Sequence, residues 1–138
     1  MEILSRKTLT YTCLVLEKIF ATTLFVADLE RTKSFYSSAF EKSPVYEDPN
    51  SVVFQFGESL INLLVESEAP GLISPALVAP QESGSRFQFT IQVDDVDAQA
   101  VRLEKLGIPL VNGPMDRPWG IRTLLFEDPD GHLWELAK

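Results

Sequence analysis

Few side chains in this sequence are of a type that does chemistry on its own. His132 is the only histidine and Cys13 the only cysteine among the 138 residues. A lone histidine forms neither a multi-histidine metal site nor, without a matching serine, a nucleophilic triad. A lone cysteine allows no disulfide bond within the chain, and no basic neighbour in the sequence activates Cys13, so we expect a structural or incidental role for it.

His132 follows Asp128-Pro-Asp-Gly131, a strong turn sequence. On a strand after this turn, residues 132, 134 and 136 point to one face and residues 133, 135 and 137 to the other. His132 and Glu135 should therefore lie on opposite faces, which favours a turn-stabilising or surface role for His132. Glu135 has two possible roles. It acts as a general base, or it is a carboxylate hydrogen-bonded to Gln88 or Arg122.

An internal repeat positions these residues. Segments 20–26 and 87–93 both alternate like strands, and Val26 and Val93 are 67 positions apart (93 − 26). A helical pattern follows each strand, from Asp28 to near Phe40 and from Asp95 to Gly107. Asp28 suits a helix N-cap, and Gly107 suits the left-handed residue beyond a helix end. The apolar stripes of the two helices consist of Leu29, Phe35, Tyr36, Ala39 and Phe40, and of Val96, Ala100, Leu103 and Leu106.

Three short strands are predicted after each helix. They span residues 45–47, 52–56 and 60–66 in the first half, and residues 110–112, 120–126 and 132–136 in the second. The chain is thus a single domain, 1–138, made of an N-terminal arm (1–18), a first repeat (19–66), a linker (67–85) and a second repeat (86–138). The linker is rich in proline and glycine, and it could fold over a ligand cavity.

Two stretches of sequence resemble a known superfamily. They are Thr22-Thr-Leu-Phe-Val-Ala-Asp-Leu-Glu-Arg-Thr-Lys-Ser-Phe-Tyr36, and Arg117-Pro-Trp-Gly-Ile-Arg122 with Phe126-Glu-Asp-Pro-Asp-Gly-His-Leu-Trp-Glu135. Together they are similar to the opening strand and helix and the closing hairpin of the vicinal oxygen chelate (glyoxalase/bleomycin resistance/dioxygenase) superfamily. The resemblance runs from about Phe20 to the C-terminus. It implies an α+β fold, in which two tandem βαβββ repeats form a curved mixed sheet around a cavity with the helices on the outer face, and it implies a homodimer.

Metal-using members of that superfamily take four ligands from equivalent places in the two repeats. The resemblance puts these places at Ala21, Asn62, Gln88 and Glu135. Ala21 has no donor atom, Asn62 and Gln88 offer neutral amides, and only Glu135 is of the usual ligand type. Because zinc and iron sites need about three strong donors, we expect no resident metal and no cofactor. A harder ion such as Mg²⁺ or Mn²⁺, which accepts more water ligands, is the alternative.

The cavity implied by the resemblance is an apolar cup with a few polar anchors, a composition typical of small-molecule sites. Trp119 either stacks on a planar or cationic ligand at the mouth or packs at the sheet edge. Arg122 pairs with Glu135, with an anionic ligand, or in a surface ion pair. The predicted cavity residues are Ala21, Thr23, Phe25, Asn62, Leu64, Gln88, Thr90, Trp119, Arg122 and Glu135.

Charge narrows the choice of partner. Lysine and arginine number 12 against 20 aspartate and glutamate, a net charge of −8. This balance repels phosphate backbones, so nucleic acid is not expected as a partner, whereas a cationic ligand is compatible with it. No apolar run is long enough to span a bilayer, residues 1–18 lack a signal-peptide pattern, and the lone cysteine fits a reducing compartment; we therefore expect a cytoplasmic protein with no membrane partner.

Three functions fit these observations. The first is a metal-independent binding protein for a small hydrophobic or cationic molecule, such as an antibiotic. The second is a lyase, isomerase or dioxygenase-like enzyme that depends on a divalent metal, with Glu135 as the one candidate catalytic residue. The third is a purely structural role through dimer formation, because a fold alone does not decide function.

Overall fold

The computed structural model describes residues 16–138 of the chain. Residues 1–15 of the predicted N-terminal arm, and Cys13 with them, lie outside the described residues. No helix among residues 16–138 is both long and apolar enough to cross a membrane.

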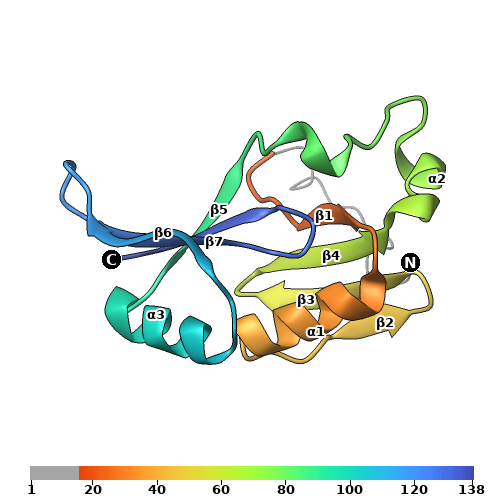
Figure 1. The fold of residues 1–138 in the computed structure, drawn as a ribbon. Helices are drawn as coiled ribbons and strands as arrows, with labels where there is room; N and C mark the ends of the chain where they lie inside the picture. The colour runs from red at the N-terminus through yellow and green to blue at the C-terminus, as the bar shows by residue number, and fades with distance from the viewer. Residues whose placement is uncertain (1–15) are drawn as a thin grey trace.

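Two βαβββ repeats make up the described chain, as predicted (Figure 1). The first contains β1 (Ala21–Val26), α1 (Leu29–Ala39), β2 (Tyr46–Asp48), β3 (Ser51–Phe56) and β4 (Ser59–Val65). The second contains β5 (Gln88–Gln92), α3 (Val96–Lys105), β6 (Leu110–Asp116), β7 (Arg122–Glu127) and β8 (Leu133–Ala137). The linker between them holds three short helical turns, η3 (Glu66–Glu68), α2 (Pro70–Ile73) and η4 (Gln81–Ser83).

Each repeat folds into its own four-stranded sheet with the same strand order. The orders are β1-β4-β3-β2 and β5-β8-β7-β6. In each sheet the first strand pairs in parallel with the last, and the remaining pairs are antiparallel. The predicted α+β architecture of tandem repeats is confirmed, and its strands divide between two sheets that form no closed barrel within residues 16–138.

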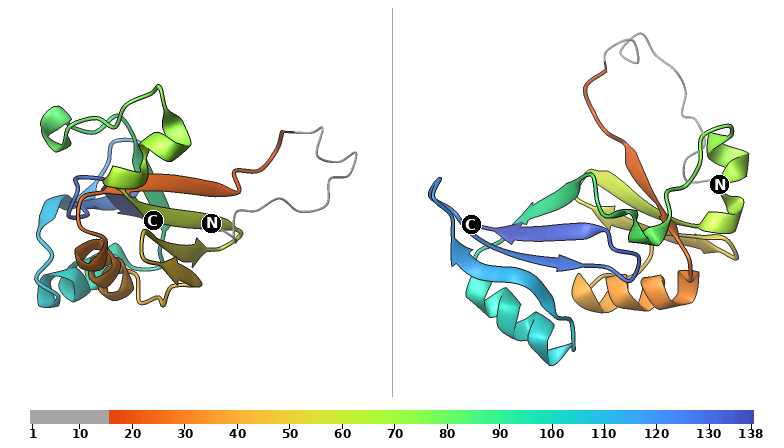
Figure 2. Two further views of the ribbon diagram at one scale, coloured as in Figure 1. Left: turned by 90° about the vertical axis from the view of Figure 1, so that its right-hand side faces the viewer. Right: turned by 45° about the horizontal axis from the view of Figure 1, so that its top comes forward.

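Both helices begin at the predicted caps. The Asp28 carboxylate accepts a hydrogen bond from the Arg31 amide at 3.1 Å, and the Asp95 carboxylate accepts one from the Ala98 amide at 3.0 Å. These bonds satisfy amides that a helix leaves free in its first turn. Helix α1 and helix α3 lie on the same side of the two sheets, and the linker segment with α2 lies on the other side (Figures 1 and 2).

A single apolar core joins the two repeats on the helix side. Trp134 of β8 is 1% exposed, and its ring lies 4.6 Å from that of Phe40 at the end of α1 and 4.4 Å from that of Phe89 on β5. Tyr36 of α1, fully buried, packs edge-on against Trp134 at 5.8 Å. Because α1 contacts side chains of both sheets, the second repeat completes the packing of the first.

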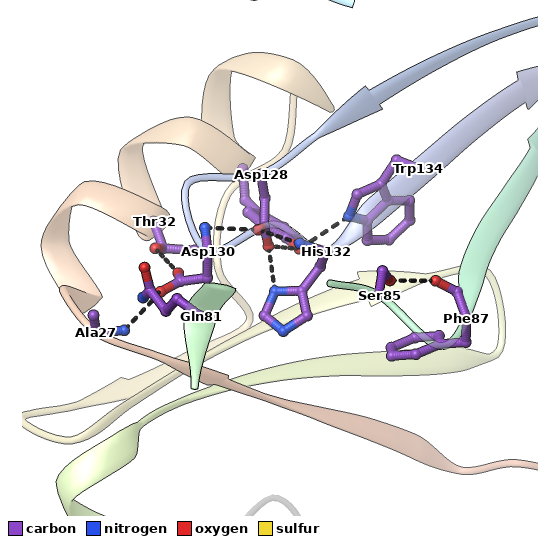
Figure 3. Close-up of polar contacts among 10 residues, drawn as sticks. Ala27, Thr32, Gln81, Ser85, Phe87, Asp128, Asp130, His132 and Trp134 are labelled. Carbon is purple, nitrogen blue, oxygen red and sulfur yellow. Dashed lines mark hydrogen bonds and ion pairs between the residues drawn. The ribbon is translucent and has the colours of Figure 1, made fainter. Parts of the chain in front are cut away.

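The turn between β7 and β8 ties the repeats together through polar contacts (Figure 3). The buried Asp128 carboxylate accepts hydrogen bonds from the Tyr36 hydroxyl at 2.8 Å and from the backbone amides of Asp130 and His132, both at 2.9 Å. Trp134 Nε1 donates to the Tyr36 oxygen at 3.0 Å. Burial, followed by the charge and hydrogen bond of Asp128, raises the pKa of Tyr36 well above its usual value, so this hydroxyl stays protonated and donates.

Candidate functional site

The face of each sheet that points away from α1 and α3 carries one matching polar pair. Asn62 Nδ2 donates to the Thr23 hydroxyl at 3.2 Å in the first sheet, and the Thr90 hydroxyl donates to Glu135 Oε1 at 2.9 Å in the second. In both cases the two residues are direct partners in the parallel strand pair. Thr23 and Thr90 are 67 positions apart (90 − 23), the offset of the repeat. The structure thus brings four of the predicted site residues together as two equivalent pairs.

A hollow of about 750 Å³ opens on this face of the first sheet. Asn62 and Leu64 of β4, two of the predicted cavity residues, form part of its lining. The linker, which the sequence suggested as a cover for the cavity, contributes to it from the opposite side. The lining residues are Asp48, Pro49, Asn50, Ser51, Asn62, Leu64, Glu68, Gly71 and Leu72.

Asn62 is the most unusual residue of this hollow. The residue is 1% exposed, and its Oδ1 atom accepts no hydrogen bond from any residue in the described part of the chain. Buried polar atoms are nearly always paired, because an unpaired one costs about 1–3 kcal/mol. Protein atoms cover Oδ1 here, so an N–H or O–H group of a bound molecule would supply the missing donor only once those atoms move aside.

The rim of the hollow is acidic. Asp48 accepts hydrogen bonds from the Tyr46 hydroxyl and from the backbone amides of Asn50 and Ser51, each at 2.8 Å. The Tyr46 bond, followed by the Asn50 amide, holds the pKa of Asp48 below its usual value. The exposed Glu68 adds a second carboxylate to the same lining. Negative charge at the mouth favours a cationic guest over an anionic one.

The second polar pair has different surroundings. Thr90 is exposed and Glu135 is half-buried. The observed partner of Glu135 is Thr90 rather than Gln88 or Arg122. Thr90 lines another hollow, of about 510 Å³, which lies between the repeats beside Phe40 and Phe56. The other carboxylate oxygen of Glu135, Oε2, is therefore available to accept a hydrogen bond from solvent or from a further chain.

Arg122 forms the surface ion pairs that were one of its three predicted alternatives. Its guanidinium lies 2.9 Å from Asp97 of α3 and 3.0 Å from Asp116 at the end of β6. Arg122 has the same parity along β7 as the buried Leu124 and Phe126, so it shares the helix side of the sheet rather than the face of Glu135. Trp119 lies in the β6–β7 turn, 67% exposed, with the Arg117 guanidinium 5.9 Å from its ring centre.

The other predicted site residues stay apart. Ala21 is the strand partner of Leu60 in the first sheet, and Gln88 that of Leu133 in the second. Phe25 lines a third hollow beneath the linker. Gln88 is exposed at the free edge of its sheet. Their assignment to one shared cavity stays a prediction.

The four places implied as metal ligands do not fit a tightly bound metal. Ala21 has no donor, Asn62 and Gln88 offer only neutral amide oxygens, and Glu135, which accepts from the Thr90 hydroxyl, is the one carboxylate among the four. No group of three histidine, cysteine, aspartate or glutamate side chains within residues 16–138 is arranged to hold an ion. One carboxylate with neutral amides falls short of the donors that zinc or iron requires.

The sequence pointed to the His132 turn but not to its full set of contacts. His132 Nδ1 lies 2.8 Å from Asp128 Oδ2, which agrees with the turn-stabilising role. The Asp128–Tyr36 bond across the repeats gave no sequence signal, because the two residues are 92 positions apart. The sequence did not predict which linker residues line the hollow of the first sheet, because a linker has no periodic pattern that assigns side chains to a face.

Comparison with known proteins places the chain in a family. Residues 18–136 match the model of the Glyoxalase/Bleomycin resistance protein/Dioxygenase superfamily. The chain belongs to this superfamily, as the tandem repeats and the two matching strand pairs indicate.

Named relatives are similar over most of their length. The phenazine antibiotic resistance protein EhpR of Enterobacter agglomerans is 29% identical over 111 residues, which cover 80% of this chain and 83% of EhpR. The metallothiol transferase FosB of Lysinibacillus sphaericus is 26% identical over 111 residues, covering 80% and 74% of the two chains. The crystal structure of a glyoxalase-related enzyme from Fulvimarina pelagi shares the fold, with a TM-score of 0.77, 23% identity and 88% coverage of each chain.

Proposed function

We propose that this chain is a metal-independent binding protein for a small hydrophobic or cationic molecule, and that an antibiotic is a suitable guest. The observation that carries the proposal is the buried, unpaired Oδ1 of Asn62 at the hollow of the first sheet. A guest with a hydrogen-bond donor satisfies this atom once it displaces the protein atoms that cover Oδ1. Leu64 and Leu72 offer apolar contact, and the acidic rim attracts positive charge. The relative named as a phenazine antibiotic resistance protein supports a planar, nitrogen-containing guest.

We further propose that the protein works as a homodimer. β1 and β5 are each one of the two edge strands of their sheets, and the face of β5 exposes Gln88, Thr90 and Gln92 to solvent. A second copy that covers this face would enclose Glu135 as well.

The experiment uses the cationic phenazine dye safranin O and, as a neutral comparison without donor groups, phenazine itself. We expect the protein to bind safranin more tightly, as measured by isothermal titration calorimetry. Asn62→Leu removes the unpaired acceptor at nearly constant volume and should weaken safranin binding about tenfold or more, equivalent to about 1.4 kcal/mol. Phenazine, which has no donor for this atom, should be affected much less.

Gln55→Leu provides the matched control. Gln55 is an exposed amide on the neighbouring strand β3 and donates to the Gly57 carbonyl, outside the hollow lining. This variant should bind safranin like the unchanged protein. Equal weakening by both substitutions would reject the role of Asn62.

The alternative is an enzyme that depends on a divalent metal. The relative named a metallothiol transferase and the Glu135 carboxylate favour it. Metal analysis of the purified protein, with thermal shifts in Mn²⁺, Ni²⁺ and Zn²⁺, separates the two functions. A stoichiometric metal that disappears in Glu135→Ala would overturn the binding-protein proposal.

A further inference from the structure

A separate hollow of about 230 Å³ lies beneath the last part of the linker. Its walls come from β1, from the linker and from the β7–β8 turn. Phe25 and Phe87 provide aromatic surface, and Arg86, His132 and Glu66 bring charged or titratable groups to the lining. Figure 3 shows the His132 ring between the turn and the segment that carries Phe87.

His132 is held in a defined orientation. Its Nδ1 atom lies 2.8 Å from Oδ2 of Asp128, a carboxylate that also binds the Tyr36 hydroxyl. The Nδ1 atom therefore carries a proton. The Nε2 atom, on the other side of the ring, forms no hydrogen bond with any residue of the described chain. Figure 3 shows this second nitrogen turned away from Asp128.

The charged groups around His132 favour its protonated form. Burial acts to lower the pKa of His132, but the hydrogen bond and charge of Asp128, with the charge of Asp130, raise it above the usual value overall. Asp130 accepts from the Ala27 amide, the Gln81 side chain and the Thr32 hydroxyl. Its two oxygens are thus occupied by protein donors rather than directed at a guest.

Two cationic donors remain for a guest. Arg86 lines the hollow, and its guanidinium forms no hydrogen bond or ion pair with any residue of the described chain. His132 offers Nε2–H as a second cationic donor when its ring is protonated. Two carboxylates, Glu66 and Asp130, also line the hollow, and the negative charge of each opposes an anion. Only Glu66 has oxygens that are not held by the turn. The two phenylalanine rings provide the apolar part of the site.

We propose that this hollow binds a small aromatic carboxylate, with the carboxylate at Arg86 and His132 and the ring beside Phe25 and Phe87. Its volume of about 230 Å³ suits a single-ring molecule. Planar carboxylates pair well with a guanidinium, and aromatic rings stack or meet edge-on with phenylalanine. This site is distinct from the hollow at Asn62 and takes a guest of opposite charge, so it stands or falls independently of the function proposed above.

The test uses 4-fluorobenzoate with the full-length protein. Fluorine NMR of the ligand reports binding, and proton NMR of the single histidine reports the site. We expect saturable shifts of the His132 ring signals and an upward shift of their titration midpoint when the ligand is bound, because an anion stabilises the imidazolium. 4-Fluorobenzyl alcohol, which lacks the charge, should bind about tenfold more weakly or worse.

Variants locate the site. His132→Gln and Arg86→Met should each weaken 4-fluorobenzoate about tenfold, and Glu66→Gln should tighten it by removing the opposing carboxylate. Arg31→Met, an equivalent loss of charge on the surface of α1, should leave the affinity unchanged. Since His132 also supports the turn, Arg86→Met, at an exposed residue just after the linker, is the variant that remains informative if His132→Gln folds poorly.

Two outcomes would overturn the proposal. One is the absence of saturable shifts at His132. The other is a 4-fluorobenzoate affinity that Arg86→Met and Glu66→Gln leave unchanged, which would show attraction to the protein surface in general.

Discussion

The two repeats share a topology but use their equivalent positions differently. In the first sheet the Thr23–Asn62 pair is covered, and Asn62 is 1% exposed. In the second sheet the equivalent Thr90–Glu135 pair faces outward, with Thr90 exposed. The linker segment with α2 lies over the first sheet (Figure 2), and its Glu68, Gly71 and Leu72 line the same hollow as Asn62. Duplication has thus provided two copies of one polar position, and the connecting segment distinguishes a candidate guest site from an open face.

The last hairpin of each repeat differs as well. In the first repeat the β3–β4 turn contains Gly57 and Glu58, and the Glu58 carboxylate forms only an exposed ion pair with Lys18 at 3.7 Å. In the second repeat the β7–β8 turn contains Asp128, which is 3% exposed and reaches Tyr36 in the other repeat. Substitutions at such matched places separate what the shared fold requires from what each repeat has added.

The largest effect is expected from Asp128→Ala. The substitution leaves the buried Tyr36 hydroxyl and two backbone amides without their acceptor, and His132 without its partner. Removing one member of a buried polar network costs about 3–5 kcal/mol. Urea unfolding measures the loss. Glu58→Ala in the equivalent turn should change the free energy of unfolding by less than about 0.5 kcal/mol, and similar losses in the two variants would show that the turns are equivalent after all.

A smaller effect is expected from Thr23→Ala compared with Thr90→Ala. Thr23 provides the hydrogen bond to the buried Asn62 amide, so its loss should cost about 1–2 kcal/mol. Thr90 is exposed, and water replaces its hydroxyl at Glu135, so its loss should cost less than about 0.5 kcal/mol. Unfolding of both variants under one set of conditions gives the difference directly. A larger loss at Thr90 would reverse the contrast between covered and open faces.

The smallest effect concerns the residues that follow the two helices. Gly107 follows α3 with φ +77°, and Glu41 holds the matching place after α1 with φ +52°. Because a side chain makes this left-handed conformation costly, Glu41→Gly should stabilise the protein by up to about 1 kcal/mol, and Gly107→Ala should destabilise it by about as much. The ion pair of Glu41 with Arg102, 3.8 Å long and exposed at Glu41, offsets little of this gain. Thermal unfolding midpoints that move in the same direction for both variants would contradict it.

The sequence predicted the features that depend on local patterns. Alternating strands, the Asp28 cap and Gly107 at a helix end follow from residue types a few positions apart, and the structure has all of them. Alternation along β7 also places Arg122 with Leu124 and Phe126, which is why Arg122 reaches Asp97 rather than Glu135.

The contacts that define the candidate sites could not be predicted in this way. Asn62 was named as a cavity residue, but nothing in the sequence shows that its Oδ1 is buried without a partner. Glu68 and Leu72 line the same hollow because of the path that an aperiodic linker takes. The bond from Tyr36 to Asp128 depends on how two separately folded sheets dock.

The bond between Tyr36 and Asp128 also bears on how the protein is made. Tyr36 is synthesised long before Asp128 and Trp134. The nascent first repeat therefore leaves the ribosome with the hydroxyl of Tyr36 and the apolar side of α1 still uncovered. The first repeat cannot reach its final packing until the last strand has left the exit tunnel. Final packing of the first repeat therefore waits for the synthesis of the β7–β8 turn and of β8.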